Sequence, residues 1–295
     1  MRPSTVLILM VCNVVWALNV VVSKVVVTDL GVPPMFYALS RSLVAVVLLF
    51  PLFFKIPQKL VQVMLVGLAI GGGSFALFFM GLKTATPSAA GIVNLSSAPM
   101  TVLFAILFLG EKIGWRRALG IAMTLVGVGI AMGSPSAMGS LSGLLLVFAA
   151  AVIGALGSVF FKRLDVGALD MQAWAGLASA IVLLPASMTA ETGQIAAIEA
   201  APWEFAAALS FAGVVVSIGA HTAYYKILQV EDANLVVPLT LLTPLLTIAM
   251  GATITGDEIG WSMIVGSTLA MAGVAIIILR PSTTLFKPTI LRPRL

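Results

Sequence analysis

Residues 110–115 read GEKIGW and residues 256–261 read GDEIGW, so nearly the same six residues occur twice, 146 positions apart. Each copy lies between two long apolar stretches. The same offset pairs Leu82 with Leu228, and it aligns Phe75 and Phe78 with His221 and Tyr224. The chain therefore contains two copies of one unit.

The composition excludes a soluble protein. Of the 295 residues, 60% are hydrophobic and only 9% are charged, and the mean hydropathy is +1.15. Ordinary globular domains carry about 25% charged residues, so this chain has too few charges to cover a surface that faces water. We conclude that the lipid bilayer is its main solvent.

A bilayer core requires about 20 apolar residues per helix, and this length divides the chain into ten spans. The spans cover residues 5–27, 34–54, 61–81, 87–109, 116–133, 140–161, 170–189, 203–226, 233–254 and 260–279, and proline, glycine or charged residues separate them. Continuous apolarity predicts helices, because the strands of a membrane barrel would alternate.

Five spans separate equivalent points in the two copies, and an odd number inverts the second copy relative to the membrane. We therefore expect an all-α membrane protein with ten transmembrane helices, arranged as two inverted five-helix repeats. The first repeat covers residues 1–135 and the second covers 136–281. A basic cytoplasmic tail follows at 282–295.

Lysine and arginine are distributed unequally between the two sides of this arrangement. Thirteen of the sixteen fall on the side that holds both termini, Lys24 and Lys83 fall on the other, and Arg41 lies inside a span. Cytoplasmic loops carry an excess of these residues. This predicts a multi-pass protein of the cell (inner) membrane with both termini in the cytoplasm.

Several function classes find no support in the residues. The net charge is +5, but the basic residues lie mainly in short loops and in the last sixteen residues. The sequence carries no nucleic-acid-binding signature. Cys12 and His221 are the only cysteine and histidine, which excludes a multi-cysteine metal site and a catalytic triad. We expect no enzyme, no cofactor, no metal and no nucleic-acid partner.

The two halves resemble the EamA-type branch of the drug/metabolite transporter superfamily. Each half closes with a proline and, about eleven residues later, a glycine followed by an acidic residue. The matching stretches run from Leu82 to Trp115 and from Leu228 to Trp261, with Trp16-Ala17 as further support, and the resemblance covers nearly the whole chain. The size of the chain further resembles the bacterial aromatic amino-acid exporters of this group.

This resemblance implies export of amino acids or related metabolites. It also implies that spans one to four and six to nine line a central cavity, while spans five and ten pack outside it.

Polar and aromatic residues at helical spacing indicate which helix faces line such a cavity. The candidate substrate-binding residues are Trp16, Asn19, Phe75, Phe78, Asn94, Ser97, Ser217, His221, Tyr224, Thr240 and Thr243. Asn94 and Ser97 share one face of the fourth span with Thr101, and Thr240 and Thr243 share the equivalent face of the ninth with Thr247. Hydrogen bonding between helices is the alternative for such polar residues, and for Asn13 in particular.

Arg41 has two interpretations. An arginine inside a span is costly, so it either extends to the outer interface or lines the vestibule of the cavity and attracts a carboxylate. For His221 we expect a hydrogen-bonding role in the cavity wall, because no acidic residue lies near it in the sequence.

These observations predict a secondary transporter that exports small neutral or zwitterionic metabolites by alternating access. We expect amino acids, aromatic or hydrophobic, as substrates. The alternative is an exporter of nucleobases, drugs or organic cations, which would call for an acidic residue deep in a span, and none is present. A membrane enzyme or a channel fits less well.

Overall fold

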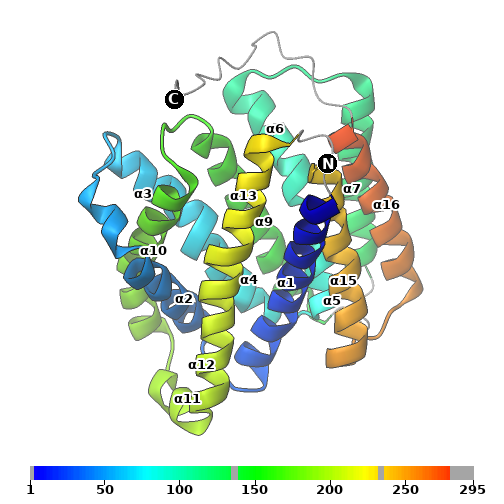
Figure 1. Cartoon of the computed structure of the whole chain (residues 1–295). Coiled ribbons are helices and arrows are strands. Elements are labelled where there is room, and N and C mark those ends of the chain that lie inside the picture. The colour runs from blue at the N-terminus through cyan, green and yellow to red at the C-terminus, as the bar shows by residue number, and fades with distance from the viewer. Residues whose placement is uncertain (1–2, 134–138, 232–235, 280–295) are drawn as a thin grey trace.

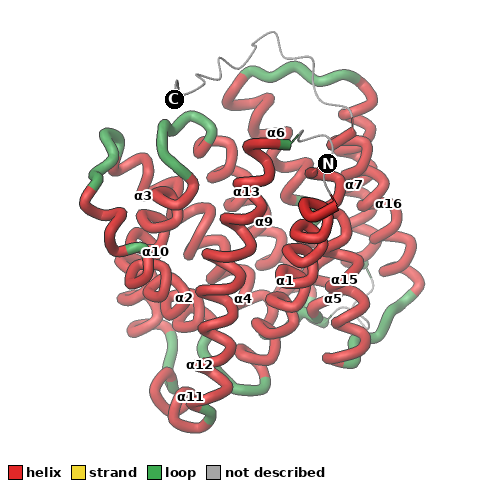
Figure 2. The backbone as a smooth tube through the Cα atoms, viewed as in Figure 1, coloured by secondary structure: helices red, strands yellow, loops and turns green. Residues whose placement is uncertain are grey.

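The computed structural model describes residues 3–133, 139–231 and 236–279. Within these ranges the chain folds into a bundle of helices, and the sole β pairing is an isolated bridge between Ala85 and Gly139 (Figures 1 and 2). The expected tail at 282–295 and the expected boundary between the halves at 135 and 136 lie outside the described residues.

The helices of the first half follow the predicted spans, with interruptions inside several of them. They are α1 (Pro3–Thr28), α2 (Pro34–Leu48), η1 (Phe50–Phe54), α3 (Leu60–Leu68), η2 (Ala69–Gly73), α4 (Ser74–Leu82), α5 (Pro87–Asn94), α6 (Ser97–Leu109) and α7 (Trp115–Met132).

The second half has a similar order of elements. They are α9 (Leu141–Phe161), α10 (Ala168–Ala190), α11 (Gln194–Ala200), α12 (Pro202–Ser210), η3 (Phe211–Ala220), α13 (His221–Val230), η4 (Val237–Leu241), α15 (Leu242–Met250), η5 (Gly251–Thr255) and α16 (Trp261–Leu279).

Among the described residues, eight helical stretches are long and apolar enough to cross a bilayer, and two further apolar helices, Pro34–Leu48 and Leu239–Thr255, are shorter. These two occupy the second and ninth of the ten predicted spans. The second span, predicted over 34–54, is α-helical only to Leu48, because Pro51 has no N–H for the carbonyl four residues earlier. The start of the ninth span, at 233–235, lies outside the described residues.

Four of the helical stretches change geometry near the middle of their length. The third passes through the π-helical segment η2 and the eighth through the longer π-helical segment η3. In the fourth, α5 ends at Asn94 and α6 begins at Ser97. Pro99 cannot donate to the carbonyl of Leu95, and the backbone tightens there, with Ser96 N–H bonding the Val93 carbonyl at 3.0 Å. In the ninth, the short 3₁₀ segment η4 precedes α15.

α7 and α16 pack against each other along one flank of the bundle (Figure 1). Glycines allow this contact: Gly120 faces Gly273, and Gly127 faces Gly266. A Cβ atom at Gly127 would lie 2.5 Å from the backbone nitrogen of Ala270. The earlier glycine of α7, Gly120, faces the later glycine of α16, and the later one, Gly127, faces the earlier one. The two helices are therefore antiparallel.

One end of the bundle is held by three side chains that cap the helices of other spans, and we call it the capped end. Lys24 Nζ donates to the carbonyls of Leu82 and Ala85, at 2.7 and 3.0 Å, after the end of α4. The Glu191 carboxylate accepts from the N–H groups of Met35 and Phe36 in α2, and Asp257 accepts from the Ser88 N–H in α5 at 2.8 Å. The charges match the partial charges of these helix ends. The loops after α6 and α9 lie at the opposite end (Figure 2).

Candidate functional site

A central cavity of about 440 Å³ lies inside the bundle. Its wall comes from α1, α2, α4, α5, α9, η3, α13, η4 and α15. Most of the residues expected from the sequence line it, namely Trp16, Asn19, Phe75, Phe78, Asn94, His221, Tyr224, Thr240 and Thr243, together with Arg41. Val20, Ser74, Ala150 and Val216 complete the lining.

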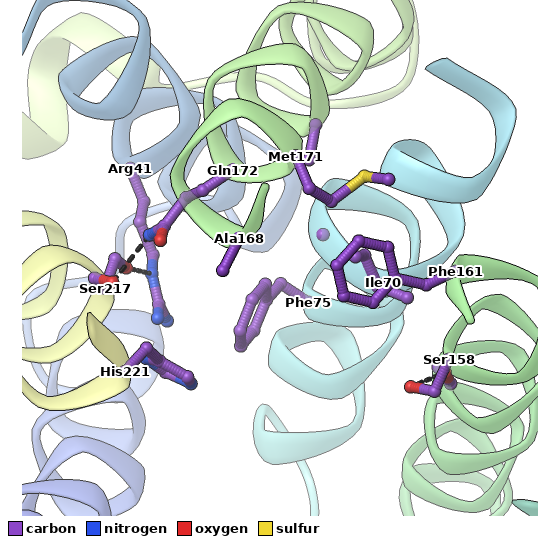
Figure 3. Close-up of a pocket in the computed structure, with 13 residues that line it drawn as sticks. Arg41, Ile70, Phe75, Ser158, Phe161, Ala168, Met171, Gln172, Ser217 and His221 are labelled. Carbon is purple, nitrogen blue, oxygen red and sulfur yellow. Dashed lines mark hydrogen bonds between the residues drawn. The ribbon is translucent and has the colours of Figure 1, made fainter. Parts of the chain in front are cut away.

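A second cavity of about 260 Å³, the side cavity, shares Arg41, Phe75 and His221 with the central one. It continues between η2, α9 and α10, as far as Phe161 and Ala168 beside the loop that follows α9 (Figure 3). Ser217 lines this side cavity. The side cavity therefore leads from the middle of the bundle toward the end opposite the capped end.

Ser97 lines neither of these two cavities. The expectation that it shares a face with Asn94 assumed one continuous helix. The chain instead leaves the α-helix after Asn94 and resumes it at Ser97, and the two tighter turns between them change the angular register. Asn94 thus lies at the end of a helix, facing the central cavity.

Aromatic rings form one wall of the central cavity. The Trp16 ring lies 5.5 Å from that of His221 and 5.2 Å from that of Tyr224, measured between ring centroids. Trp16 Nε1 and Asn19 Oδ1 are buried and make no hydrogen bond within the described residues. The cavity wall thus presents one donor and one acceptor that have no partner in the part of the chain that the structure describes.

The π-helical segment η3 positions Ser217 and His221. Ser217 Oγ donates to the Ala212 carbonyl at 2.8 Å, and His221 Nδ1 lies 2.8 Å from the Val216 carbonyl. Both contacts reach five residues back, which is the spacing of the π-helix. Since a carbonyl only accepts hydrogen bonds, Nδ1 carries a proton, and in the neutral ring Nε2 is an acceptor.

Arg41 lies where the two cavities meet and is only 5% exposed. Its Nε donates to Ser217 Oγ at 2.9 Å, and its guanidinium carbon lies 4.0 Å from the centroid of the Phe75 ring. Nη1 is buried without a hydrogen-bond partner among the described residues. The side chain therefore lies inside the bundle and does not extend to its surface.

Gln172 is a site residue that the sequence analysis did not single out. It lines the side cavity, and its Nε2 donates to the Ser217 backbone carbonyl at 2.6 Å, beside Arg41 (Figure 3). A glutamine within an apolar span is a signal that could have identified it. Ser74 and Met171 carry no comparable signal, because small and apolar residues occur on every face of these helices.

The lining combines hydrogen-bonding groups, aromatic rings and one arginine, which is an arrangement suited to a small organic molecule. No Asp or Glu is among the residues that line the two cavities. The described residues contain no group of three or more His, Cys, Asp or Glu that could hold a metal ion.

Comparison with known proteins gives consistent matches over most of the chain. The model of the EamA-like transporter family matches residues 3–133 and again residues 141–279. A protein of Salmonella typhimurium named "Probable amino-acid metabolite efflux pump" is 28% identical over 280 residues, which cover 89% of this chain and 91% of that protein. An Escherichia coli protein of the same name is 26% identical over 289 residues, which cover 93% of this chain and 94% of that protein.

A solved crystal structure is similar in fold, with a TM-score of 0.59 and 20% sequence identity. The match covers 94% of this chain and 96% of the solved one.

Proposed function

Because this chain belongs to the EamA-like transporter family, we propose that it exports amino acids, aromatic or hydrophobic, across the inner membrane. Its apolar helices and its family support a multi-pass membrane transporter rather than an enzyme. The two curated relatives are named as probable amino-acid metabolite efflux pumps and align over most of their length. Their names support this class of substrate.

The observation that carries the proposal is a cavity located where helices are interrupted. Asn94 ends α5 and Thr240 lies in the 3₁₀ segment η4, and both line the central cavity. Interrupted membrane helices are tolerated where their backbone borders a cavity. In transporters built from repeats, interruptions at corresponding positions of the two halves point to the substrate site.

We further propose that the two halves are inverted five-helix repeats, 1–135 and 136–281, with ten spans in total. The family model matches twice, once in each half. The α7–α16 contact also supports this. At the 146-residue offset Gly120 corresponds to Gly266 and Gly127 corresponds to Gly273. In the contact these glycines pair crosswise, since Gly120 faces Gly273 and Gly127 faces Gly266. Thr124 Oγ1 lies 3.4 Å from the carbonyl of its own counterpart, Ala270. Such self-paired contacts are expected at a two-fold axis.

In this arrangement α2 and the stretch Leu239–Thr255 act as the second and ninth spans. The positive loops and both termini, including the tail at 282–295, face the cytoplasm, and the capped end faces outward. Residues 110–117 and 162–163, which contain five of the sixteen lysines and arginines, support this orientation because they lie at the end opposite the capped end.

The mechanism that we propose is alternating access. The halves move about the central cavity, and the substrate enters through the side cavity from the cytoplasm. Release requires the three caps at the outer end to separate. His221 forms part of the wall, since its Nδ1 is engaged by the Val216 carbonyl.

The lining also argues against an exporter of organic cations. A cationic drug would require a carboxylate in the cavity, whereas the charged side chain that lines both cavities is Arg41. No second function is favoured by a particular contact.

A counterflow assay tests the proposal. The full-length protein, reconstituted in liposomes loaded with one unlabelled amino acid, should accumulate the same labelled amino acid from outside. A panel that includes phenylalanine, tryptophan, leucine and cysteine, with choline and adenine as controls, defines the class. Accumulation of choline or adenine but of no amino acid would contradict the proposal.

A further inference from the structure

We infer that the guanidinium of Arg41 binds the carboxylate of the exported molecule, and that this carboxylate contributes more to recognition than an ammonium group does. The inference rests on the function proposed above, because it names the chemical group by which the cavity recognises its substrate.

The first step of the argument is that Arg41 is a buried charge with incomplete compensation. A charged side chain inside a membrane bundle is costly and is usually paired or functional. The protein supplies one hydrogen bond, from Nε to Ser217 Oγ, and the face of the Phe75 ring. Among the described residues Nη1 has no hydrogen-bond partner, and no Asp or Glu lines either of the cavities where this side chain lies. A donor and a positive charge therefore remain unmatched.

The second step is that a ligand can reach this group. Arg41 lines both the central cavity and the side cavity, so any molecule that passes between them passes the guanidinium. The Nε bond to Ser217 and the stacking on Phe75 fix the plane of the guanidinium (Figure 3). A fixed planar guanidinium suits the planar carboxylate group.

The third step concerns the amount of charge. Arg41 is the only Lys or Arg among the residues that line these two cavities. A carboxylate carries one negative charge and balances the single positive charge of Arg41. A phosphate monoester carries nearly two and would leave an excess negative charge in the bundle. The site therefore favours a monoanionic group.

The fourth step is that the ammonium group of an amino acid has weaker partners. The lining offers it neutral acceptors such as Asn19 Oδ1, which has no partner among the described residues, and the ring faces of Trp16 and Tyr224. It offers no carboxylate. Removing the carboxylate of a ligand should therefore cost more affinity than removing its ammonium charge.

The experiment compares three related ligands on the full-length protein in liposomes. L-phenylalanine, N-acetyl-L-phenylalanine and L-phenylalaninamide compete with the labelled amino acid that shows counterflow. The N-acetyl compound, which keeps the carboxylate, should bind within a few-fold of L-phenylalanine. The amide should bind about 10- to 100-fold more weakly, as expected for loss of a charged hydrogen bond.

Variants then identify the group responsible. Arg41→Gln should lower the affinity for L-phenylalanine and its N-acetyl form to that of the amide, and leave the amide unchanged. Arg41→Lys keeps the charge but loses the planar geometry, so it should be intermediate. Arg117→Gln is the matched control, because Arg117 lies in the first turn of α7 and lines neither cavity.

Binding is also read without transport, as the rise in melting temperature of the purified protein. The probes are 3-phenylpropanoate, 3-phenylpropylamine and inorganic phosphate. The carboxylate should stabilise the wild type and the Arg117→Gln variant, but not Arg41→Gln. If this holds while no amino acid shows counterflow, the carboxylate site stands and the proposed function fails.

The opposite results overturn the inference and leave amino-acid export in place. The first is that L-phenylalaninamide competes as well as L-phenylalanine in the wild type. The second is that Arg41→Gln still prefers L-phenylalanine over the amide as strongly as the wild type does. Stabilisation by the amine in place of the carboxylate also overturns it. A larger shift with phosphate than with the carboxylate would assign the site to phosphate instead.

Discussion

The Thr243 hydroxyl donates a 2.6 Å hydrogen bond to Asn13 Oδ1 and so joins α15 to α1 across 230 residues of sequence. Asn13 is 1% exposed, and its Nδ2 donates to the Leu9 carbonyl at 2.7 Å. Both ends of its amide are therefore satisfied, as an amide in a membrane interior requires. Of the polar residues considered in the first span, Asn13 takes the helix-joining role and Asn19 faces the cavity.

We expect this bond to stabilise the fold measurably. Asn13→Ala and Thr243→Val should each lower the free energy of unfolding, measured by titration with a denaturing detergent. Their coupling energy should be about 0.5–2 kcal/mol, within the range for hydrogen bonds between membrane helices. Thr268→Val is the control, since that exposed hydroxyl bonds only within its own helix. Additive effects of the two substitutions would contradict the prediction.

The glycine contact between α7 and α16 predicts opposite effects at two nearby positions. Gly127→Ala should destabilise by about 1–3 kcal/mol, because its Cβ would overlap the backbone of α16. Gly129→Ala should be neutral or stabilise by up to about 1 kcal/mol, because nothing lies within 4 Å of its Cβ and alanine favours the helix. Melting temperatures in one detergent compare the two, and equal shifts would exclude the close approach.

Thiol labelling tests which side chains face the cavity. In a Cys12→Ala background, Asn94→Cys and Thr240→Cys should react with small hydrophilic thiol reagents, and substrate should slow both reactions. Ser97→Cys should show no protection, because Ser97 lines neither cavity. Protection at all three positions would mean that the fourth span is one continuous helix in the membrane.

Reporter fusions test the orientation. A fusion near Lys112 and one at the C-terminus should report the cytoplasm, whereas a fusion near Glu199, in α11, should report the outside. The reason is the excess of lysine and arginine in the cytoplasmic loops. An external C-terminus would contradict the ten-span arrangement, since it requires an odd number of spans.

His221→Gln tests whether His221 carries protons or only shapes the wall. Glutamine can retain a hydrogen bond but does not titrate. We expect transport to keep much of its rate and its dependence on pH, with altered preference among amino acids, in counterflow and in pH-gradient assays. Loss of gradient-driven transport with exchange preserved would make His221 the proton carrier.

Eight of the ten predicted spans coincide with described helices that are long and apolar enough to cross a bilayer, because apolarity over about 20 residues reports burial in lipid directly. Interruptions within a span are harder to foresee. The pairing of Asn94 with Ser97 assumed helical periodicity, yet Pro99 breaks that period between them. Pro51 likewise ends α2 early while its neighbours remain apolar.

The orientation of Arg41 depends on packing, which residue spacing does not encode. Its contacts come from η3 and α4, far away in the sequence. Sequence reasoning could state two alternatives for this side chain, and only the tertiary contacts distinguish them. Gln172 was missed for a related reason, since it gains its place through the Ser217 carbonyl on another helix.

The three caps at the capped end, which we propose faces outward, carry a consequence for the dynamics of release. The N–H groups of Met35, Phe36 and Ser88, and the Leu82 carbonyl, lie at helix ends, where the helix itself offers no partner. Their bonds come from Glu191, Asp257 and Lys24. When that end opens, water must replace each of these bonds as it breaks. The opening step is therefore a wetting transition, and its rate should fall when solutes that lower water activity are added on the outer side.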